Sequence, residues 1–309
     1  MNRHDSTAPA RYDVRHITSY AYSEPVPVCH NEVHLTPRSL PRQRVLASAI
    51  RVAPEPAQIT THVDFFGNQV GRFTIEGPHE RLAITATSRV EVEPARPWQD
   101  LPARPWEQVR DQLATDRAAE AIRARHFAFE SPHVRPSAPL ATWAAESFRP
   151  GRPWTEALVD LTTRIHREFA YDPTATTTST PVEEVFALKR GVCQDFAHLL
   201  IGAWRLWGLP ARYVSGYLLT EPAAGESALL GADASHAWVQ LWCPGTPGVG
   251  ADGWLDLDPT NNLVPTTGHV RVAVGRDFGD VTPLRGVIRG GGVHTLSVGV
   301  TTRRRTPAR

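Results

Sequence analysis

The order of periodic patterns along the chain is the feature that most restricts its fold. From Tyr12 to about Glu93, short runs rich in β-branched and aromatic residues alternate with polar residues, and turn residues such as Gly67 separate the runs. Such runs predict an antiparallel β domain with a sandwich-like form. After Gly151, helical patterns come first and strand patterns follow. That order is typical of an α+β domain whose helices pack on an antiparallel sheet.

The length of 309 residues suits two domains. We expect an N-terminal β domain over residues 1–95, a proline-rich helical linker region over 96–152, an α+β core over 153–303 and a disordered tail over 304–309. Five strand-like runs are expected in the first of these parts. In the core, we expect two long helices followed by the strands.

Composition and charge exclude several classes of function. The net charge is +1 and no long basic run precedes the tail "TTRRRTPAR", so no nucleic-acid partner is expected. No window approaches the ~20 apolar residues of a membrane span, and the first residues lack the apolar stretch of a signal peptide. The three cysteines show no CxxC spacing, which favours a reducing compartment without a disulfide framework. We therefore expect a cytoplasmic protein that does not contact a membrane.

Cys193 stands where a helical pattern begins. In "KRGVCQDFAHLLIGAWRLWGLP", it follows the turn residue Gly191, and apolar residues then recur on one helical face. A helix N-terminus carries unpaired N–H groups and partial positive charge, so it can stabilise a thiolate and hold the oxyanion of an acyl intermediate. A buried cysteine that only packs would show the same pattern, so this helix alone leaves both interpretations open.

Two later strand patterns, "SHAWVQLWC" and "GWLDLDP", could bring partners to this thiol. If the hairpin closes with Cys243 opposite Gly253, the numbers of paired residues sum to about 496, and Asp258 becomes a diagonal neighbour of His236. A slip of one residue would put Asp258 on the other face. Cysteine, histidine and aspartate in this arrangement are typical of acyl-transfer catalysis, in which the carboxylate fixes the imidazole tautomer.

Several motifs also resemble a known family. "GVCQDFAHLL", "RYVSGYL", "SHAWVQLW" and "GWLDLDPTNN", in this order and spacing, resemble the transglutaminase-like superfamily, specifically its bacterial branch of two-domain proteins. "HITSYAYSEPV" and "HLTPR" resemble the β domain that precedes the core in that branch, and "VAVGRDFGDVTPLRGV" resembles its C-terminal continuation. The likeness covers nearly the whole chain.

The resemblance implies a papain-like α+β fold for the core. It implies Cys193 as nucleophile, His236 as general base and acid, and Asp258 as the orienting carboxylate. No metal or other cofactor is expected: His198 lies on the same predicted helix as Cys193, but five residues rotate it by about 140° from the cysteine.

Four further residues are candidates for substrate binding or support. Gln194 offers a side-chain donor to an oxyanion hole, although an exposed glutamine in the first helical turn is the plainer interpretation. Trp238 and Trp254 flank the candidate histidine and aspartate and could shield the imidazole or line the acyl site, although core packing explains them equally well. Tyr217 could border the site.

The expected function is thiol-dependent acyl transfer on a peptide or carboxamide carbonyl through a cysteine thioester, with a peptide or protein as substrate. Hydrolysis of the protease or amidase kind is favoured over cross-linking. Two alternatives stay open: transamidation from glutamine to an amine, and a catalytically inactive module that binds a protein. The resemblance also implies work alongside peptide-ligating enzymes.

Overall fold

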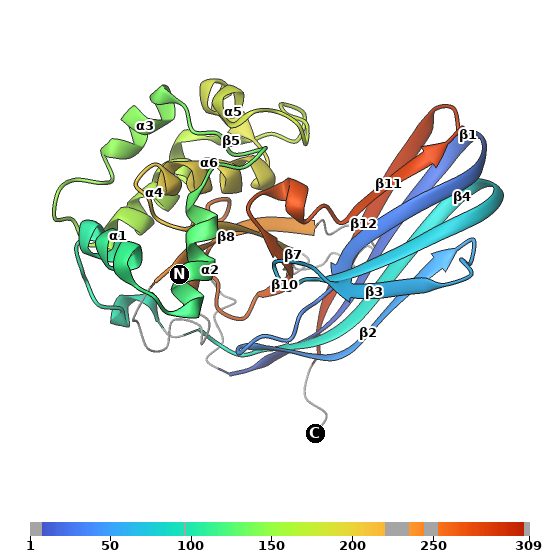
Figure 1. Cartoon of the computed structure of the whole chain (residues 1–309), viewed down its shortest axis with the longest axis horizontal. Helices are drawn as coiled ribbons and strands as arrows, with labels where there is room; N and C mark the ends of the chain where they lie inside the picture. Colours follow the sequence, from blue (N-terminus) through green and yellow to red (C-terminus); the bar gives the residue numbers. More distant parts are fainter. Residues whose placement is uncertain (1–7, 96, 220–234, 244–252, 306–309) are drawn as a thin grey trace, which may run out of the picture.

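The computed structural model describes residues 8–95, 97–219, 235–243 and 253–305, which form a β-sheet domain beside a domain of helices and strands (Figure 1). The first domain begins with four strands in chain order. They are β1 (Ala10–Thr36), β2 (Gln43–Ala53), β3 (Ile59–Val63) and β4 (Gln69–Val92). Five strand-like runs were expected, but β1 and β4 each continue through a turn signal, so fewer and longer strands result.

The second domain contains helices first and strands afterwards, as the patterns predicted. Its helical elements are η1 (Trp98–Asp100), α1 (Trp106–Thr115), α2 (Ala119–Arg125), η2 (His126–Ala128), α3 (Ala138–Ala145), α4 (Trp154–Glu168), α5 (Val182–Leu188), α6 (Cys193–Arg205) and η3 (Phe278–Asp280). Its strands are β5 (Ala170–Tyr171), β6 (Arg190–Gly191), β7 (Ala211–Leu218), β8 (Ser235–Trp242), β9 (Trp254–Leu257) and β10 (His269–Gly275).

The main sheet of this domain has the order β10-β7-β8-β9, and every neighbouring pair is antiparallel. The helices α4 and α6 share one apolar cluster with the sheet. The linker helices α1 and α3 contribute to the same cluster through side chains such as Trp106 and Leu140. The α+β class expected from the sequence is therefore confirmed.

The N-terminal sheet is continuous but bends into two halves. One half places β12 (His294–Arg305), the start of β1, the end of β4 and β2 side by side. The other half combines β11 (Leu284–Arg289), the rest of β1, the start of β4 and β3. Val33 of the second half and Ile84 of the first lie in one buried cluster. The sandwich-like core thus comes from one sheet that folds onto itself.

Two expected domain limits need correction at the C-terminal end. The strands β11 and β12 pair with β1, so residues 284–303 belong to the N-terminal sheet and not to the core. Arg304 and Arg305 continue β12 and are not part of a disordered tail. The physical reason is that β1 needs a hydrogen-bonding partner along its second edge, and the end of the chain supplies it. Residues 306–309 lie outside the described part, as does the Gly/Pro-rich connection 244–252.

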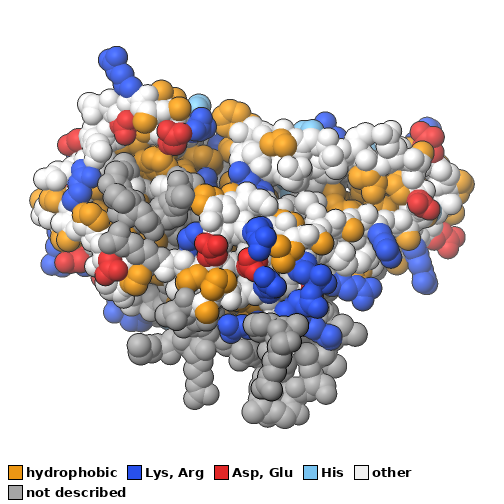
Figure 2. Space-filling view, turned by 90° about the horizontal axis from the view of Figure 1, so that it is seen from below, with side chains coloured by type: hydrophobic (Ala, Val, Ile, Leu, Met, Phe, Trp, Pro, Cys, Tyr) orange, Lys and Arg blue, Asp and Glu red, His pale blue; other side chains and the backbone are white. Residues whose placement is uncertain are grey.

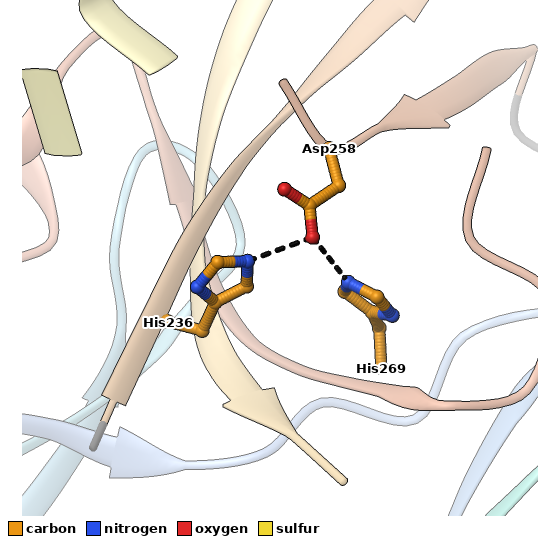
Figure 3. Close-up of side chains that lie close together, drawn as sticks. All are labelled: His236, Asp258 and His269. Carbon is orange, nitrogen blue, oxygen red and sulfur yellow. Dashed lines mark hydrogen bonds and ion pairs between the residues drawn. The ribbon is translucent and has the colours of Figure 1, made fainter. Parts of the chain in front are cut away.

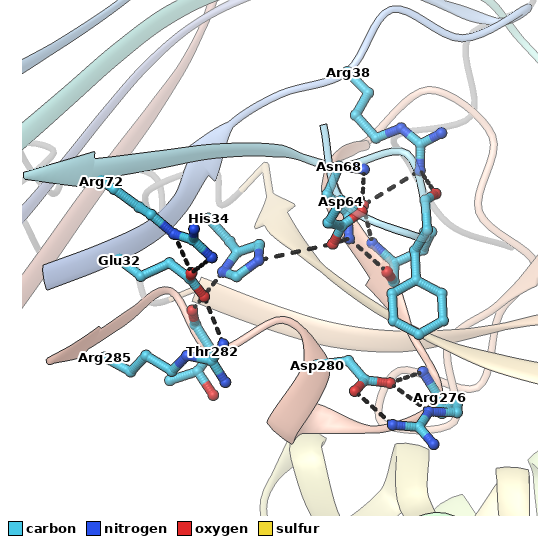
Figure 4. Close-up of polar contacts among 12 residues, drawn as sticks. Glu32, His34, Arg38, Asp64, Asn68, Arg72, Arg276, Asp280, Thr282 and Arg285 are labelled. Atoms are coloured by element: carbon cyan, nitrogen blue, oxygen red, sulfur yellow. Dashed lines mark hydrogen bonds and ion pairs between the residues drawn. The ribbon is translucent and has the colours of Figure 1, made fainter. Parts of the chain in front are cut away.

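Two amide side chains of the N-terminal domain hold the edge strand β10. Gln43 accepts a hydrogen bond from the backbone N–H of Arg271 at 2.8 Å and donates to its carbonyl at 2.7 Å. Asn68 does the same at Val274, at 2.9 and 2.8 Å, and is itself held by Asp64 (Figure 4). Both amides are buried. They therefore satisfy backbone groups that an edge strand would leave unpaired.

A buried ion pair also joins the two domains. Arg42, which lies just before β2, donates to the Asp256 carboxylate of β9 at 3.3 Å, and Trp238 donates its indole N–H to the other carboxylate oxygen at 2.8 Å. Burial raises the pKa of Asp256, but the charges of Arg271 and Arg42 and the indole hydrogen bond outweigh it, and the net pKa is lowered. The contact thus links the N-terminal domain to a tryptophan of the core sheet.

The outward face of the first half-sheet is strongly charged. Across neighbouring strands, Glu91 accepts from both Arg11 and Arg44, and Asp13 pairs with Arg89 and Arg305. Figure 2 shows charged side chains of both signs gathered near the middle of the view from below.

Within the described residues, none of the helices combines the length and the apolar character needed to cross a bilayer.

Replacing Arg42 with glutamine should lower the free energy of unfolding by about 2–3 kcal/mol. This is less than the usual cost of removing one partner of a buried pair, because Arg271 and Trp238 still contact Asp256. Arg44→Gln is the matched control, since Arg44 pairs at the exposed surface and its loss should leave stability nearly unchanged. Urea unfolding of both variants checks this. Equal effects of the two changes would contradict a buried junction at Arg42.

Candidate active site

Cys193 is the first residue of α6 and the most accessible residue of that helix. Its side chain is partly exposed, whereas all twelve residues that follow it in the helix are buried. The helix is thus buried on every side and not only along the predicted stripe. The thiol therefore stands at a solvent-accessible end of a core helix.

A buried carboxylate fixes the start of this helix. Asp195 accepts a hydrogen bond from the backbone N–H of Val192 at 2.8 Å and another from the Thr176 hydroxyl at 2.6 Å. It takes the place of the acidic residue of a capping box, which reaches back to the N-cap N–H. Gly191 leaves room for it, because a Cβ at that position would come within 2.5 Å of the carboxylate. Burial raises the pKa of Asp195.

His236 lies at the start of β8, in the register that the sequence predicted. Val239 pairs with Leu257 and Trp242 with Trp254, so the paired numbers sum to 496 as expected. The Trp238 ring lies nearly parallel to the His236 ring, with centroids 6.1 Å apart. The neighbouring strand has Gly216 opposite His236, and a Cβ there would come within 2.5 Å of the Trp238 ring.

Asp258 is fully buried in the turn that follows β9, and it accepts hydrogen bonds on both oxygens. Oδ1 accepts from the backbone N–H groups of Thr260 and Asn261, at 3.0 and 3.1 Å. Oδ2 accepts from His236 Nε2 at 2.8 Å, from His269 Nε2 at 3.0 Å and from the Asn261 side chain at 2.7 Å. Figure 3 shows the carboxylate between the two imidazoles.

These contacts set the charge states of the carboxylate and the imidazole. Burial raises the pKa of Asp258, but the hydrogen bonds and charges of His236 and His269 outweigh burial and hold that pKa well below its usual range. For His236, burial lowers the pKa, whereas hydrogen bonds to Asp258 and Cys193 and their charges raise it, with a net value of about 10. At neutral pH the site therefore contains a carboxylate and an imidazolium.

The three residues named first from the sequence come together in space. Nε2 of His236 donates to Asp258, so Nδ1 is the ring nitrogen that is left for the hydrogen bond with Cys193. A protonated ring beside a thiol at a helix N-terminus is the arrangement of a nucleophile with its proton donor. The arrangement can therefore present a nucleophile, a proton donor and a group that orients the donor.

The four supporting candidates behave differently from one another. Gln194 was expected to be exposed, but it is buried. Its side chain donates to the backbone carbonyl of Thr178 at 3.0 Å. Trp238 does stack on the imidazole of the site. Tyr217 points elsewhere, and its hydroxyl lies 3.1 Å from Nδ1 of His16 in the N-terminal sheet. Trp254 packs at the far end of the hairpin, in a separate cluster with α1, α2 and Trp242.

Two residues around Asp258 were missed from the sequence. His269 begins β10, and only the spatial strand order, in which β7 separates β10 from β8, brings it to Asp258. Asn261 belongs to the quoted motif "GWLDLDPTNN", where an Asx residue after a strand indicates a turn. Its position was recognisable, but its hydrogen bond to the carboxylate was not.

Comparison with known proteins identifies both parts of the chain. Residues 12–91 match the bacterial transglutaminase-like N-terminal region, and residues 141–259 match the transglutaminase-like superfamily. A protein of Mycobacterium tuberculosis (strain H37Rv), named as uncharacterized, is 41% identical over 294 residues, which cover 90% of this chain and 87% of the relative. A Mycobacterium leprae protein, also named as uncharacterized, is 32% identical over 291 residues, covering 93% and 96%.

Two further likenesses are more limited. A Pseudomonas aeruginosa protein named protein-glutamine gamma-glutamyltransferase is 34% identical over 132 residues, which cover 41% of this chain and 19% of that protein. The crystal structure of "a Putative Cysteine Protease from Cytophaga hutchinsonii" superposes with a TM-score of 0.71 at 19% identity, covering 97% of this chain and 92% of that one. At that identity the likeness concerns the fold. The matched regions and the full-length relatives show that this chain belongs to the transglutaminase-like superfamily, in which its core follows a bacterial transglutaminase-like N-terminal region.

Proposed function

We propose that this protein catalyses thiol-dependent acyl transfer on a peptide or carboxamide carbonyl, with Cys193 as nucleophile. The observation that carries the proposal is the hydrogen-bonded chain from a buried Asp258 through His236 to the thiol at the start of α6. Membership of the superfamily supports it. An inactive binding module would explain the buried carboxylate and imidazole as a structural pair, but it would not explain a partly exposed thiol that is hydrogen-bonded to the same imidazole.

The reaction follows from the charge states of the site. The Cys193 thiolate attacks the carbonyl carbon, and the first N–H groups of α6, which have no acceptor within the helix, stabilise the oxyanion. The C–N bond then breaks, the amine leaves with the proton from His236, and a thioester remains on Cys193. Water next gives a proton to His236 and attacks the thioester, which releases the acid and restores the thiolate.

We propose hydrolysis as the main outcome, because Cys193 lies at a partly exposed position that water can reach. Transamidation is the second candidate, and the local likeness to a protein-glutamine gamma-glutamyltransferase favours it. Both reactions share the thioester, and they differ only in whether water or an amine accepts the acyl group.

Cys193 should be the cysteine that reacts with iodoacetamide at pH 7. Cys29 and Cys243 are buried, and burial raises the pKa of the Cys243 thiol well above its usual value, so these two serve as internal controls in the same peptide map. His236→Asn should slow the labelling of Cys193 markedly, because it removes the positive partner of the thiolate. Equal labelling of all three cysteines in the native protein would count against an activated Cys193.

Asp258→Asn should lower kcat/KM by about 10²–10⁴-fold, because the imidazole loses the group that holds its tautomer. Removal of the carboxylate also lowers the pKa of His236, which is now raised to about 10. Since the reaction needs a protonated His236, the alkaline fall in kcat/KM should move to lower pH in the variant. Full pH profiles of wild type and variant provide the check. An unmoved alkaline limb would contradict the assigned role of Asp258.

Product analysis separates the two acceptors. Wild-type protein should convert glutamine-containing and isopeptide-linked test peptides to free acids, as mass spectrometry would show, and Cys193→Ser should lose this activity by about 10³-fold or more. The same reactions run with excess primary amine provide the comparison. Amine adducts that outweigh the acids would replace hydrolysis by transamidation as the main activity.

A further inference from the structure

We propose that His269 is a positioning residue of the site, which holds the Asp258 carboxylate in place and shares its charge with His236. The inference rests on the proposed acyl-transfer function and extends it to a second imidazole. His269 does not take part in the bond changes derived above. It acts on the reaction only through Asp258.

The geometry places two imidazoles on one carboxylate oxygen. Nε2 of His236 and Nε2 of His269 lie 2.8 and 3.0 Å from Oδ2 of Asp258, within the range of N–H···O hydrogen bonds (Figure 3). The two rings come from strands that are not neighbours, β8 and β10. The carboxylate oxygen therefore accepts hydrogen bonds from an imidazole on each side, and the side chain of Asn261 adds a third donor to the same oxygen.

Packing holds His269 in this orientation. Its side chain is 6% exposed, and the Trp238 ring meets its ring edge to face with centroids 5.0 Å apart. The same tryptophan stacks on His236. One indole thus contacts both imidazoles. A change in the position of His269 would therefore also alter the packing of the His236 ring, which lies beside Cys193.

The same three residues could instead ligate a metal ion, since their ligand atoms lie within 4.8 Å of one another. Distances decide between the two interpretations. Ligand atoms held about 2.0–2.1 Å from a tetrahedral Zn²⁺ stand about 3.4 Å apart. The observed N–O distances of 2.8 and 3.0 Å are shorter and fit N–H groups that donate directly to the carboxylate.

Sharing of the Asp258 carboxylate by two imidazoles weakens its effect on the pKa of His236. An oxygen that serves three donors stabilises each positive partner less than one that serves two. Without the His269 donor, Asp258 would interact more strongly with the His236 imidazolium, which would keep its proton to higher pH. The expected change is therefore opposite to that of Asp258→Asn.

Other titratable or charged groups near His236 bear on the same titration and stay in place in the test. Among the described residues, these groups are Cys193 of α6, Asp258 after β9, and, behind Trp238, Asp256 with Arg42 and Arg271.

Two variants of His269 test the proposal. His269→Phe keeps a ring against Trp238 but removes the donor, whereas His269→Gln keeps an N–H donor at a similar reach. We expect His269→Phe to lower kcat/KM by about tenfold, through a less well-fixed carboxylate, and to move the alkaline limb up by about one pH unit. His269→Gln should restore both values to near those of the wild type.

Titration of the ring nitrogens of His236 by NMR, in a Cys193→Ala background, gives a readout that needs no catalysis. His269→Phe should raise the titration midpoint of His236 relative to His269→Gln. Equal midpoints and equal pH profiles in the two variants, with reduced melting temperature alone, would overturn the proposal and leave His269 as a packing residue. Stoichiometric zinc in the purified wild type, lost in His269→Gln, would overturn it in favour of a metal site.

The proposed acyl-transfer function and the positioning role of His269 can be tested separately. If Cys193→Ser keeps full hydrolytic activity, the proposed function fails whatever the His269 variants do. If Cys193 is essential but the His269 variants do not differ in pH profile or in the NMR midpoint, only the positioning role fails.

Discussion

The site depends on one buried charge. Asp258 has no exposed surface, so its carboxylate can stay ionised only because surrounding donors replace the water it has lost. Five N–H groups do so: two from the backbone of its own turn, one from Asn261 and two from imidazoles. The negative charge kept in this way raises the pKa of His236 and holds a charged imidazole beside the thiol at the start of α6.

Support for this charge extends beyond the core domain. The strand β10, which begins with His269, is an edge strand, and Gln43 and Asn68 of the N-terminal domain bond to its backbone at Arg271 and Val274. Arg42 of the same domain contacts Asp256, which in turn holds the indole of Trp238. The N-terminal sheet therefore contributes to the geometry of the site without supplying any of its reacting groups. Its last strands, β11 and β12, follow the core domain in the sequence, so the N-terminal sheet is built from segments on both sides of that domain.

Local patterns predicted much of this arrangement, and long-range pairing explains what they missed. The register of β8 and β9 followed from a hairpin whose ends could be matched by alternation, so the approach of His236 and Asp258 was predictable. The position of His269 was not, because it depends on which strand lies on the far side of β7. For the same reason, the pairing of β12 with β1 could not be predicted from local patterns.

Faces were also easier to predict than contacts. Alternation correctly put Trp238 beside His236, and the predicted register put Trp254 opposite Trp242, but no strand pattern could show that α1 and α2 pack against Trp254. Gln194 was expected to be exposed because a first helical turn usually is. The segment that covers it, around Thr178, showed only as a polar loop in the sequence.

The central claim is that sulfur, imidazole and carboxylate act as one unit on an acyl substrate. The most direct measurement is peptide-mapped mass spectrometry of the protein after acid quench during turnover of a reactive ester or amide substrate. The account predicts an acyl group on Cys193, formed in the wild type and lost when His236 is replaced by asparagine. An acyl group on another residue, or turnover with no adduct at Cys193 under conditions that slow deacylation, would contradict it.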